Sequence, residues 1–89
     1  MVEEYSFCLY VAGRKAPNSI RAMKNLEKLL RNHITLPYSL EVVDILEDPD
    51  RAESDRISAT PTLAWQIGKQ RGRLVGDFSN SEKVISFLR

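Results

Sequence analysis

An apolar stretch near the start of the chain most constrains its fold. Residues 5–11, Tyr-Ser-Phe-Cys-Leu-Tyr-Val, form a short and nearly continuous apolar run. This pattern is typical of a strand that is covered on both faces, as strands of parallel sheets are. After a turn at residues 12–16, Pro17 suits the first position of a helix, because its missing N–H costs nothing there. The sequence therefore predicts a strand that crosses over into a helix, the first part of a parallel β-α-β unit.

The helix that follows is expected to span residues 17–32, with His33 after it. Its apolar residues recur at three- and four-residue spacing and define one buried face. They are Ile20, Ala22, Met23, Leu26, Leu29 and Leu30. Beside this face, a basic stripe is formed by Arg21, Lys24, Lys28 and Arg31, because residues three or four apart lie on one side of a helix. The stripe is either a solvated helix face, which composition alone favours, or a surface for an acidic partner.

Two strands and a short helix are expected in the middle of the chain. Residues 38–45 and 62–67 have the apolar, β-branched and aromatic composition that favours strands. Between them, Asp48 is placed to cap the first amides of a helix, and Pro49 fits the first helical position. The first of these strands is expected at an edge of the sheet, where it offers unpaired backbone groups to a partner.

The last third of the chain predicts a hairpin and a terminal helix. Gly68 and Gly72 bound a loop, after which residues 73–78 are expected to return as a strand. Ser79 and Glu82 have the spacing of a capping box. The resulting order in one 89-residue domain is β-α-β-α-β-β-α, with right-handed crossovers between the parallel strands. This order resembles the thioredoxin-like α/β fold.

The chemistry of thioredoxin-type enzymes is missing from this order. Such enzymes hold a C-x-x-C pair before the first helix, and this chain has none there. Cys8 and His33 are its only cysteine and histidine, so a metal site is not expected, nor is a nucleotide cofactor without a glycine-rich phosphate motif. Cys8, inside an apolar strand, is expected to be a buried and inert thiol. The sequence thus predicts a binding protein; the alternative from another class is a monothiol redox protein that uses Cys8.

The net charge of +1 hides three charge zones. Residues 1–33 carry six Lys/Arg and three acids, residues 34–60 carry two and seven, and residues 61–89 carry five and two. Nucleic-acid binding favours one dominant basic field, so the alternation points to a protein partner. In the acidic zone, Glu41 and Asp44 either meet that partner or prevent edge pairing. No run approaches the ~18 apolar residues of a membrane span, and the single cysteine makes the cytoplasm the expected location.

Several motifs taken together resemble the KaiB family. They are Leu9-Tyr-Val-Ala-Gly13, Pro17-Asn-Ser-Ile-Arg-Ala22, Glu41-Val-Val-Asp-Ile-Leu46, Asp48-Pro49, Ala59-Thr-Pro-Thr-Leu63, Gly76-Asp77 and Ser79-x-x-Glu-Lys-Val84. The motifs cover almost the entire chain in the right order, so their combination is specific. The resemblance implies a non-enzymatic protein that binds a KaiC-type ATPase in circadian or stress timing, with a KaiA- or SasA-like protein as a further partner. The nearest alternative is a SasA-type sensory domain.

The resemblance also implies particular site residues. Arg21 lies in a matched motif, and Arg56 occupies the basic position that ends the family's short acidic helix. Pro61 stands where thioredoxin-like folds have a cis-proline. The expected partner-binding residues are therefore Arg21, Lys24, Lys28, Glu41, Asp44 and Arg56.

KaiB proteins are known for two folds, a self-associated ground state and a thioredoxin-like state that binds KaiC, and this chain departs from the family where the two differ. Residues 65–73 lack the family's proline-rich stretch, and prolines disrupt strand ladders. Phe87 and Arg89 stand near the end of the terminal helix, where the family often has a glycine and an acid. Both changes favour the helix. A thioredoxin-like monomer is therefore expected.

Overall fold

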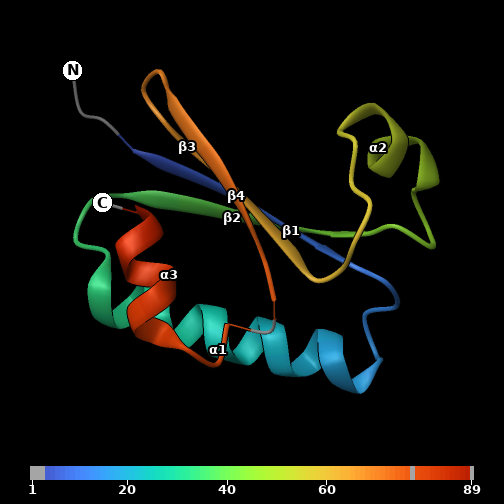
Figure 1. Ribbon diagram of the computed structural model, residues 1–89, viewed down its shortest axis with the longest axis horizontal. Coiled ribbons are helices and arrows are strands. Elements are labelled where there is room, and N and C mark those ends of the chain that lie inside the picture. The colour runs from blue at the N-terminus through green and yellow to red at the C-terminus, as the bar shows by residue number, and fades with distance from the viewer. Residues whose placement is uncertain (1–3, 77, 89) are drawn as a thin grey trace.

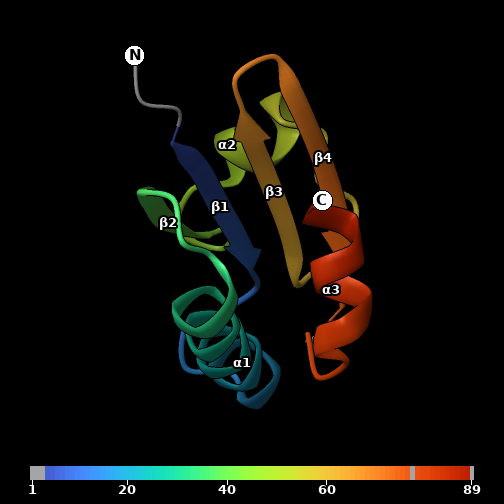
Figure 2. The ribbon, with the colours of Figure 1, turned by 90° about the vertical axis from the view of Figure 1, so that its left-hand side faces the viewer.

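The computed structural model describes residues 4–76 and 78–88 of the chain. The elements in order are β1 (Tyr5–Val11), α1 (Pro17–His33), β2 (Tyr38–Asp44), α2 (Pro49–Ser54), β3 (Thr62–Ile67), β4 (Gln70–Val75) and α3 (Ser81–Leu88). They confirm the predicted order. The strands form one sheet in the order β2-β1-β3-β4 (Figure 2), with β1 and β2 parallel and the other pairs antiparallel. β2 lies at a sheet edge, as predicted, and β4 forms the other edge.

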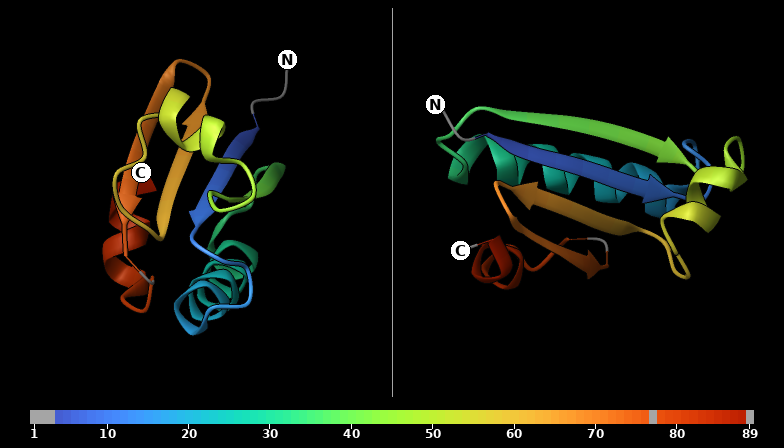
Figure 3. Two further views of the ribbon diagram at one scale, coloured as in Figure 1. Left: turned by 90° about the vertical axis from the view of Figure 1, so that its right-hand side faces the viewer. Right: turned by 90° about the horizontal axis from the view of Figure 1, so that it is seen from above.

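Helices α1 and α3 lie on one side of the sheet, and α2 lies beyond the end where β1 and β2 finish (Figures 1 and 3). The core between the sheet and the two longer helices consists of Phe7, Leu9, Val11, Ala22, Leu26, Leu29, Leu30, Leu63, Leu74, Phe78, Val84 and Leu88. Among the described residues, the structure contains no helix with both the length and the apolar character needed to cross a membrane.

The strand β1 is covered by helices on one face only, so the expectation of cover on both faces is wrong. Successive side chains of a strand point to opposite faces. Phe7, Leu9 and Val11 therefore enter the core, whereas Ser6, Cys8 and Tyr10 line a hollow on the other face of the sheet. The apolar run concealed this alternation because a cysteine and a tyrosine occupy two of the outward positions. We call this uncovered face the open face.

Helix α1 extends one residue further than predicted, to His33, and packs with a slightly different face. Ile20 is 39% exposed, whereas Ser19 is buried with 3% exposure. Each residue advances the helix by about 100°, so Ser19 lies nearly in line with Leu26 and Leu30, and Ile20 points away from them. The expected apolar face is otherwise confirmed around Leu26.

The β3–β4 hairpin is tighter than predicted. β4 begins at Gln70 opposite Ile67, so the loop is Gly68-Lys69 and the expected loop over 68–72 is wrong. Gly68 has a φ of 58° at the first of two loop positions, where a type II′ turn calls for glycine. The two-residue turn leaves residues 70–72 free to join the strand.

Gly72 therefore lies inside β4 and does not form part of a turn; its lack of a side chain makes room for a neighbouring residue. It lies opposite Trp65, and a Cβ at this position would come within 2.8 Å of the indole ring. A side chain would have to push the ring aside, because such separations are well inside van der Waals contact. β4 ends at Val75, whereas the strand was expected to reach residue 78; Asp77 lies outside the described residues.

The terminal helix α3 begins at Ser81, two residues later than the predicted cap. The Lys83 amide donates to Asn80 Oδ1 at 3.2 Å, which is the N-cap to N3 hydrogen bond of a helix start. Asn80 is therefore the cap, and the predicted capping box of Ser79 and Glu82 is wrong. The expectations for the Phe87 side chain and for Arg89 fall outside the described residues.

Candidate functional site

The place where thioredoxin-type enzymes keep their cysteines is formed here by the start of α1, which faces Pro61. The Thr60–Pro61 peptide bond is cis, as predicted. Together with residues 12, 16, 18 and 19, these two residues line a hollow of about 120 Å³. Its lining contains no thiol, imidazole or carboxylate, so the hydroxyls of Ser19 and Thr60 in this lining have no adjacent general base to activate them. The local geometry of a thioredoxin-like site is present without the groups that perform its chemistry.

Asp44 fixes the loop that leads into this site. Its carboxylate accepts hydrogen bonds from the amides of Gly13, Arg14 and Leu46, each at 3.0 Å. The bond from Gly13, supported by the other two amides, holds the pKa of Asp44 below its ordinary value. Asp44 is only 5% exposed. The structure thus corrects the expectation that Asp44 meets a partner, because its carboxylate is buried at the end of β2 and occupied by backbone amides.

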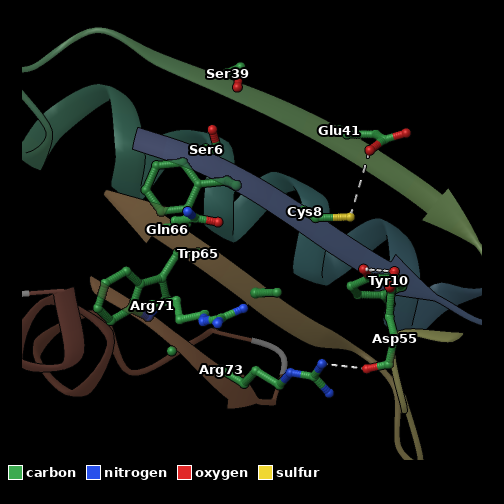
Figure 4. A pocket seen from close by; sticks show the side chains of 13 residues that line it. Ser6, Cys8, Tyr10, Ser39, Glu41, Asp55, Trp65, Gln66, Arg71 and Arg73 are labelled. Atoms are coloured by element: carbon green, nitrogen blue, oxygen red, sulfur yellow. Dashed lines mark hydrogen bonds between the residues drawn. The ribbon is translucent and has the colours of Figure 1, made fainter. Parts of the chain in front are cut away.

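A network of charged and polar side chains lies on the open face and ties α2 to the sheet. Figure 4 shows three of its members, Glu41, Tyr10 and Asp55. Arg51 donates to both carboxylate oxygens of Glu41, at 2.9 and 3.1 Å. Arg51 Nε also lies 3.6 Å from Asp55, one helical turn away. The Tyr10 hydroxyl donates to Asp55 Oδ2 at 2.5 Å. The network therefore joins β1, β2 and α2 across the face of the sheet.

The network changes the acidity of its members. The hydrogen bond from Arg51 lowers the pKa of Glu41. Burial, reinforced by the hydrogen bond to Asp55, raises the pKa of Tyr10. Glu41 and Tyr10 therefore keep their ordinary protonation states at neutral pH, an ionised carboxylate and a neutral phenol. Such a network holds α2 in place, and neither Glu41 nor Tyr10 is poised to exchange a proton near pH 7.

Cys8 lies beside this network and is half-buried, where a fully buried thiol was expected. Its Sγ accepts from Arg51 at 3.7 Å and lies 4.0 Å from Glu41 Oε1. Burial raises the pKa of the thiol, with the Glu41 charge adding to the effect. Because the thiolate is the reactive form, this environment opposes nucleophilic chemistry.

We expect Cys8 to react with a disulfide reagent at pH 7.5 more slowly than the same chain unfolded in urea. The raised pKa leaves less thiolate in the folded protein. Ellman's reagent measures both rates, and the Cys8→Ser variant gives the baseline. In an insulin reduction assay the protein should not exceed that variant. Turnover that disappears in Cys8→Ser would instead establish a redox protein.

The remaining candidates do not gather into one surface. Arg21, Lys24 and Lys28 are exposed on α1, on the helix-covered side, whereas Glu41 lies on the open face. Lys28 lines a hollow between α1 and the start of α3. Arg21 lies nearer the other end of α1 and donates to Asn18 Oδ1 at 3.1 Å. The start of α1, the part of the helix that carries Arg21, lies at the same end of the molecule as α2 (Figure 1).

Arg56 is held by the backbone in an unusual conformation. The Ile57 amide donates to the carbonyl of Ala52 and the Arg56 amide to that of Glu53, at 2.8 and 3.1 Å. These two bonds form a Schellman motif, which places the residue after the C-cap in the left-handed region. Arg56 accordingly has a φ of 58°, and its side chain is exposed. Glycine is the usual residue at this position.

Sequence reasoning overlooked Arg51, which organises the open face, and the two arginines of β4, Arg71 and Arg73. A signal for Arg51 was present, because Arg51 and Asp55 have the i, i+4 spacing of a helical ion pair. Arg71 and Arg73 were hidden by the misplaced loop, which put Arg71 outside the strand. The Arg73 guanidinium donates to the backbone carbonyls of Asp55 and Arg56, so it ties β4 to the end of α2.

Solved structures resemble this fold throughout its length. The N-terminal domain of Synechococcus elongatus SasA aligns with a TM-score of 0.79 at 22% identity, over 99% of this chain and 82% of that chain. Mitochondrial thioredoxin 3 from Saccharomyces cerevisiae aligns with a TM-score of 0.72 at 19% identity, over 93% and 74%. Identity at this level shows the fold alone. The fold is therefore thioredoxin-like, as predicted.

Sequence relatives identify the family. The circadian clock oscillator protein KaiB of Thermostichus vulcanus is 47% identical over 81 residues, which is 91% of this chain and 74% of that protein. KaiB of Prochlorococcus marinus strain MIT 9313 is 46% identical over 91% of this chain and 67% of its own length. The model of the KaiB domain matches residues 8–89. From Cys8 onward, this chain belongs to the KaiB family.

Proposed function

We propose that the protein is a non-enzymatic circadian clock or timing protein that binds a KaiC-type ATPase. The observation that carries this proposal is the 47% identity to a circadian clock oscillator protein across 91% of the chain. The hollow beside Pro61, whose lining has no thiol, imidazole or carboxylate, supports binding over catalysis. The protein acts in the cytoplasm as a thioredoxin-like monomer of one domain, without a cofactor, and a KaiA- or SasA-like protein is a further partner.

Arg56 supports a contact at the end of the molecule that carries α2. A left-handed conformation costs a non-glycine residue roughly 1–2 kcal/mol, and Arg56 adopts it. Among the residues that the structure describes, none forms a hydrogen bond or ion pair with the Arg56 guanidinium. A side chain that costs stability and gains no internal contact fits a role in binding. Arg21, at the start of α1, adds a second exposed cation at this end of the molecule.

Reversing both charges should weaken binding to the host's KaiC-type ring at least about tenfold. The Arg21→Glu/Arg56→Glu variant replaces attraction with repulsion at two rim positions, and a tenfold change corresponds to about 1.4 kcal/mol. Surface biosensing with the assembled ring measures the affinity, and circular dichroism checks the fold.

The matched control is Lys69→Glu/Lys83→Glu, which makes the same change in net charge at two exposed positions outside the start of α1 and the end of α2. An unchanged affinity in the Arg21/Arg56 variant would remove both residues from the proposed surface. An equal loss of affinity in the control variant would show that the effect comes from the change in net charge and not from these two positions. Neither outcome would alter the family assignment.

A SasA-type sensory domain is the second candidate, and the 0.79 TM-score to the SasA N-terminal domain favours it. Its 22% identity is less than half of the 47% shared with KaiB. A competition measurement on the same biosensor distinguishes the two candidates. A KaiB-like protein should displace the host's own KaiB from the ring, whereas a SasA-type domain should displace the host's own SasA.

A further inference from the structure

We propose that the outer edge of β4 accepts an extended, acidic segment of a partner protein as a fifth strand. β4 ends the sheet on this side, and edge strands present unpaired backbone groups to other chains. This surface lies across the sheet from the β2 edge. It does not depend on the proposed KaiC partner.

The two-residue turn determines which backbone groups of β4 are available. In such a hairpin the residues flanking the loop form a hydrogen-bonded pair, and bonded and non-bonded pairs then alternate. Ile67 and Gln70 flank the loop, so residues 70, 72 and 74 point their N–H and C=O groups toward β3. The Gly76 amide continues this pattern by donating to the Pro61 carbonyl. Arg71, Arg73 and Val75 therefore direct their backbone groups outward.

The same three residues carry the side chains that would select the partner. Arg71 and Arg73 alternate along the strand, are exposed, and both line the hollow on the open face (Figure 4). Lys69 adds an exposed cation in the adjacent turn. Within the described residues, Arg71 makes no hydrogen bond or ion pair, and Arg73 contacts only backbone carbonyls. The edge thus carries positive charge that no carboxylate neutralises.

Charge and spacing together define the partner segment. Residues directly opposite each other on neighbouring strands have Cβ atoms about 4.5–5.5 Å apart, so acids at alternate positions of an added strand would face Arg71 and Arg73. Val75, which is 57% exposed, favours an apolar residue near the end of the segment. The β2 edge differs because Glu41 already pairs with Arg51 there. An acidic segment should therefore bind at the β4 edge and not at the β2 edge.

A short, end-blocked fluorescent peptide of alternating glutamate and valine is the probe. Fluorescence anisotropy should show binding to the intact chain, and NMR amide shifts should centre on residues 69–75. The lysine-valine peptide should bind at least about tenfold more weakly because it repels the arginines. The Arg71→Glu/Arg73→Glu variant should lose binding to the acidic peptide by at least the same factor, whereas Lys15→Glu/Arg31→Glu, with an equal charge change at exposed positions outside β4, should keep it.

A backbone variant separates strand addition from simple charge attraction. Val75→Pro removes one outward N–H and leaves the donors to β3 intact, and proline is tolerated at such edge positions. It should weaken peptide binding several-fold, whereas Val75→Thr, which keeps the N–H, should not. Spectra of the unbound variants check that the sheet is retained.

Three results obtained with the peptide would overturn the proposal. They are the absence of peptide binding, peptide-induced shifts that centre on β2, and full affinity in Val75→Pro. A single-stranded oligonucleotide that binds this edge more tightly than the acidic peptide would also overturn it, because the surface would then select phosphates.

Discussion

Replacing Leu26 with alanine should lower the free energy of unfolding by about 3 kcal/mol, within the range of 2–5 kcal/mol for buried leucines. Leu26 is 0% exposed and lies in the core between α1 and the sheet. The change removes apolar contacts and leaves a cavity that the closely packed surroundings fill only in part. The total free energy of unfolding of a small domain is about 5–15 kcal/mol, so this one substitution would remove a large share of the stability.

Urea denaturation followed by circular dichroism measures this loss. The midpoint should fall while the slope with urea stays constant, because the surface exposed on unfolding hardly changes. Lys24→Ala, on the exposed side of the same helix, is the control and should stay within about 0.5 kcal/mol of the unchanged protein. A loss below about 1 kcal/mol for Leu26→Ala would contradict the packing of α1 against the sheet.

The elements with strong periodicity or a clear start signal were predictable from sequence. The apolar run of β1, the helical spacing of Leu26 and Leu30, and the Asp48-Pro49 start of α2 each rest on local chemistry. Asp48 indeed accepts from the Arg51 amide at 3.4 Å. The cis bond at Pro61 came from family resemblance, because the residue type alone carries only a small preference for cis.

The errors arose where several residues have the same local preference. Gly68 and Gly72 both suit a turn, and only the contact with Trp65 reveals that Gly72 belongs inside a strand. Ser79 and Asn80 are both good helix caps, so the tertiary position of α3 decides between them. Tertiary packing thus determines which glycine forms the turn and which residue caps the helix, where local sequence preferences are equal.

The candidate site was predicted less well than the fold. Asp44 was grouped with exposed acids because its charge was visible in the sequence and its three amide partners were not. Two of those partners, Gly13 and Arg14, belong to the loop after β1, which lies beside Asp44 only once β1 and β2 are paired. Arg51 was overlooked for the same reason, since Glu41 is its neighbour only after α2 folds back over β2.

Replacing Asp44 with alanine should lower the midpoint of thermal unfolding by roughly 10 °C, because in a domain of this size each lost interaction of ordinary strength shifts the midpoint by several degrees. The substitution leaves the amides of Gly13, Arg14 and Leu46 without their acceptor. Asp44→Asn should have a smaller effect, because Oδ1 still accepts from Gly13 and Leu46. Its NH₂ group would then face the Arg14 amide, a donor against a donor.

The effect of Asp44 should also depend on pH. Its pKa is lower in the folded than in the unfolded chain, so its stabilisation is complete above the unfolded value near 3.8 and is lost as the pH falls through the lower folded pKa. Thermal unfolding of the unchanged protein and of Asp44→Asn at a series of pH values measures this. The difference between them should be constant from about pH 5 upward and shrink at lower pH. A difference that stays constant down to pH 2 would show that the Asp44 charge contributes nothing to the loop.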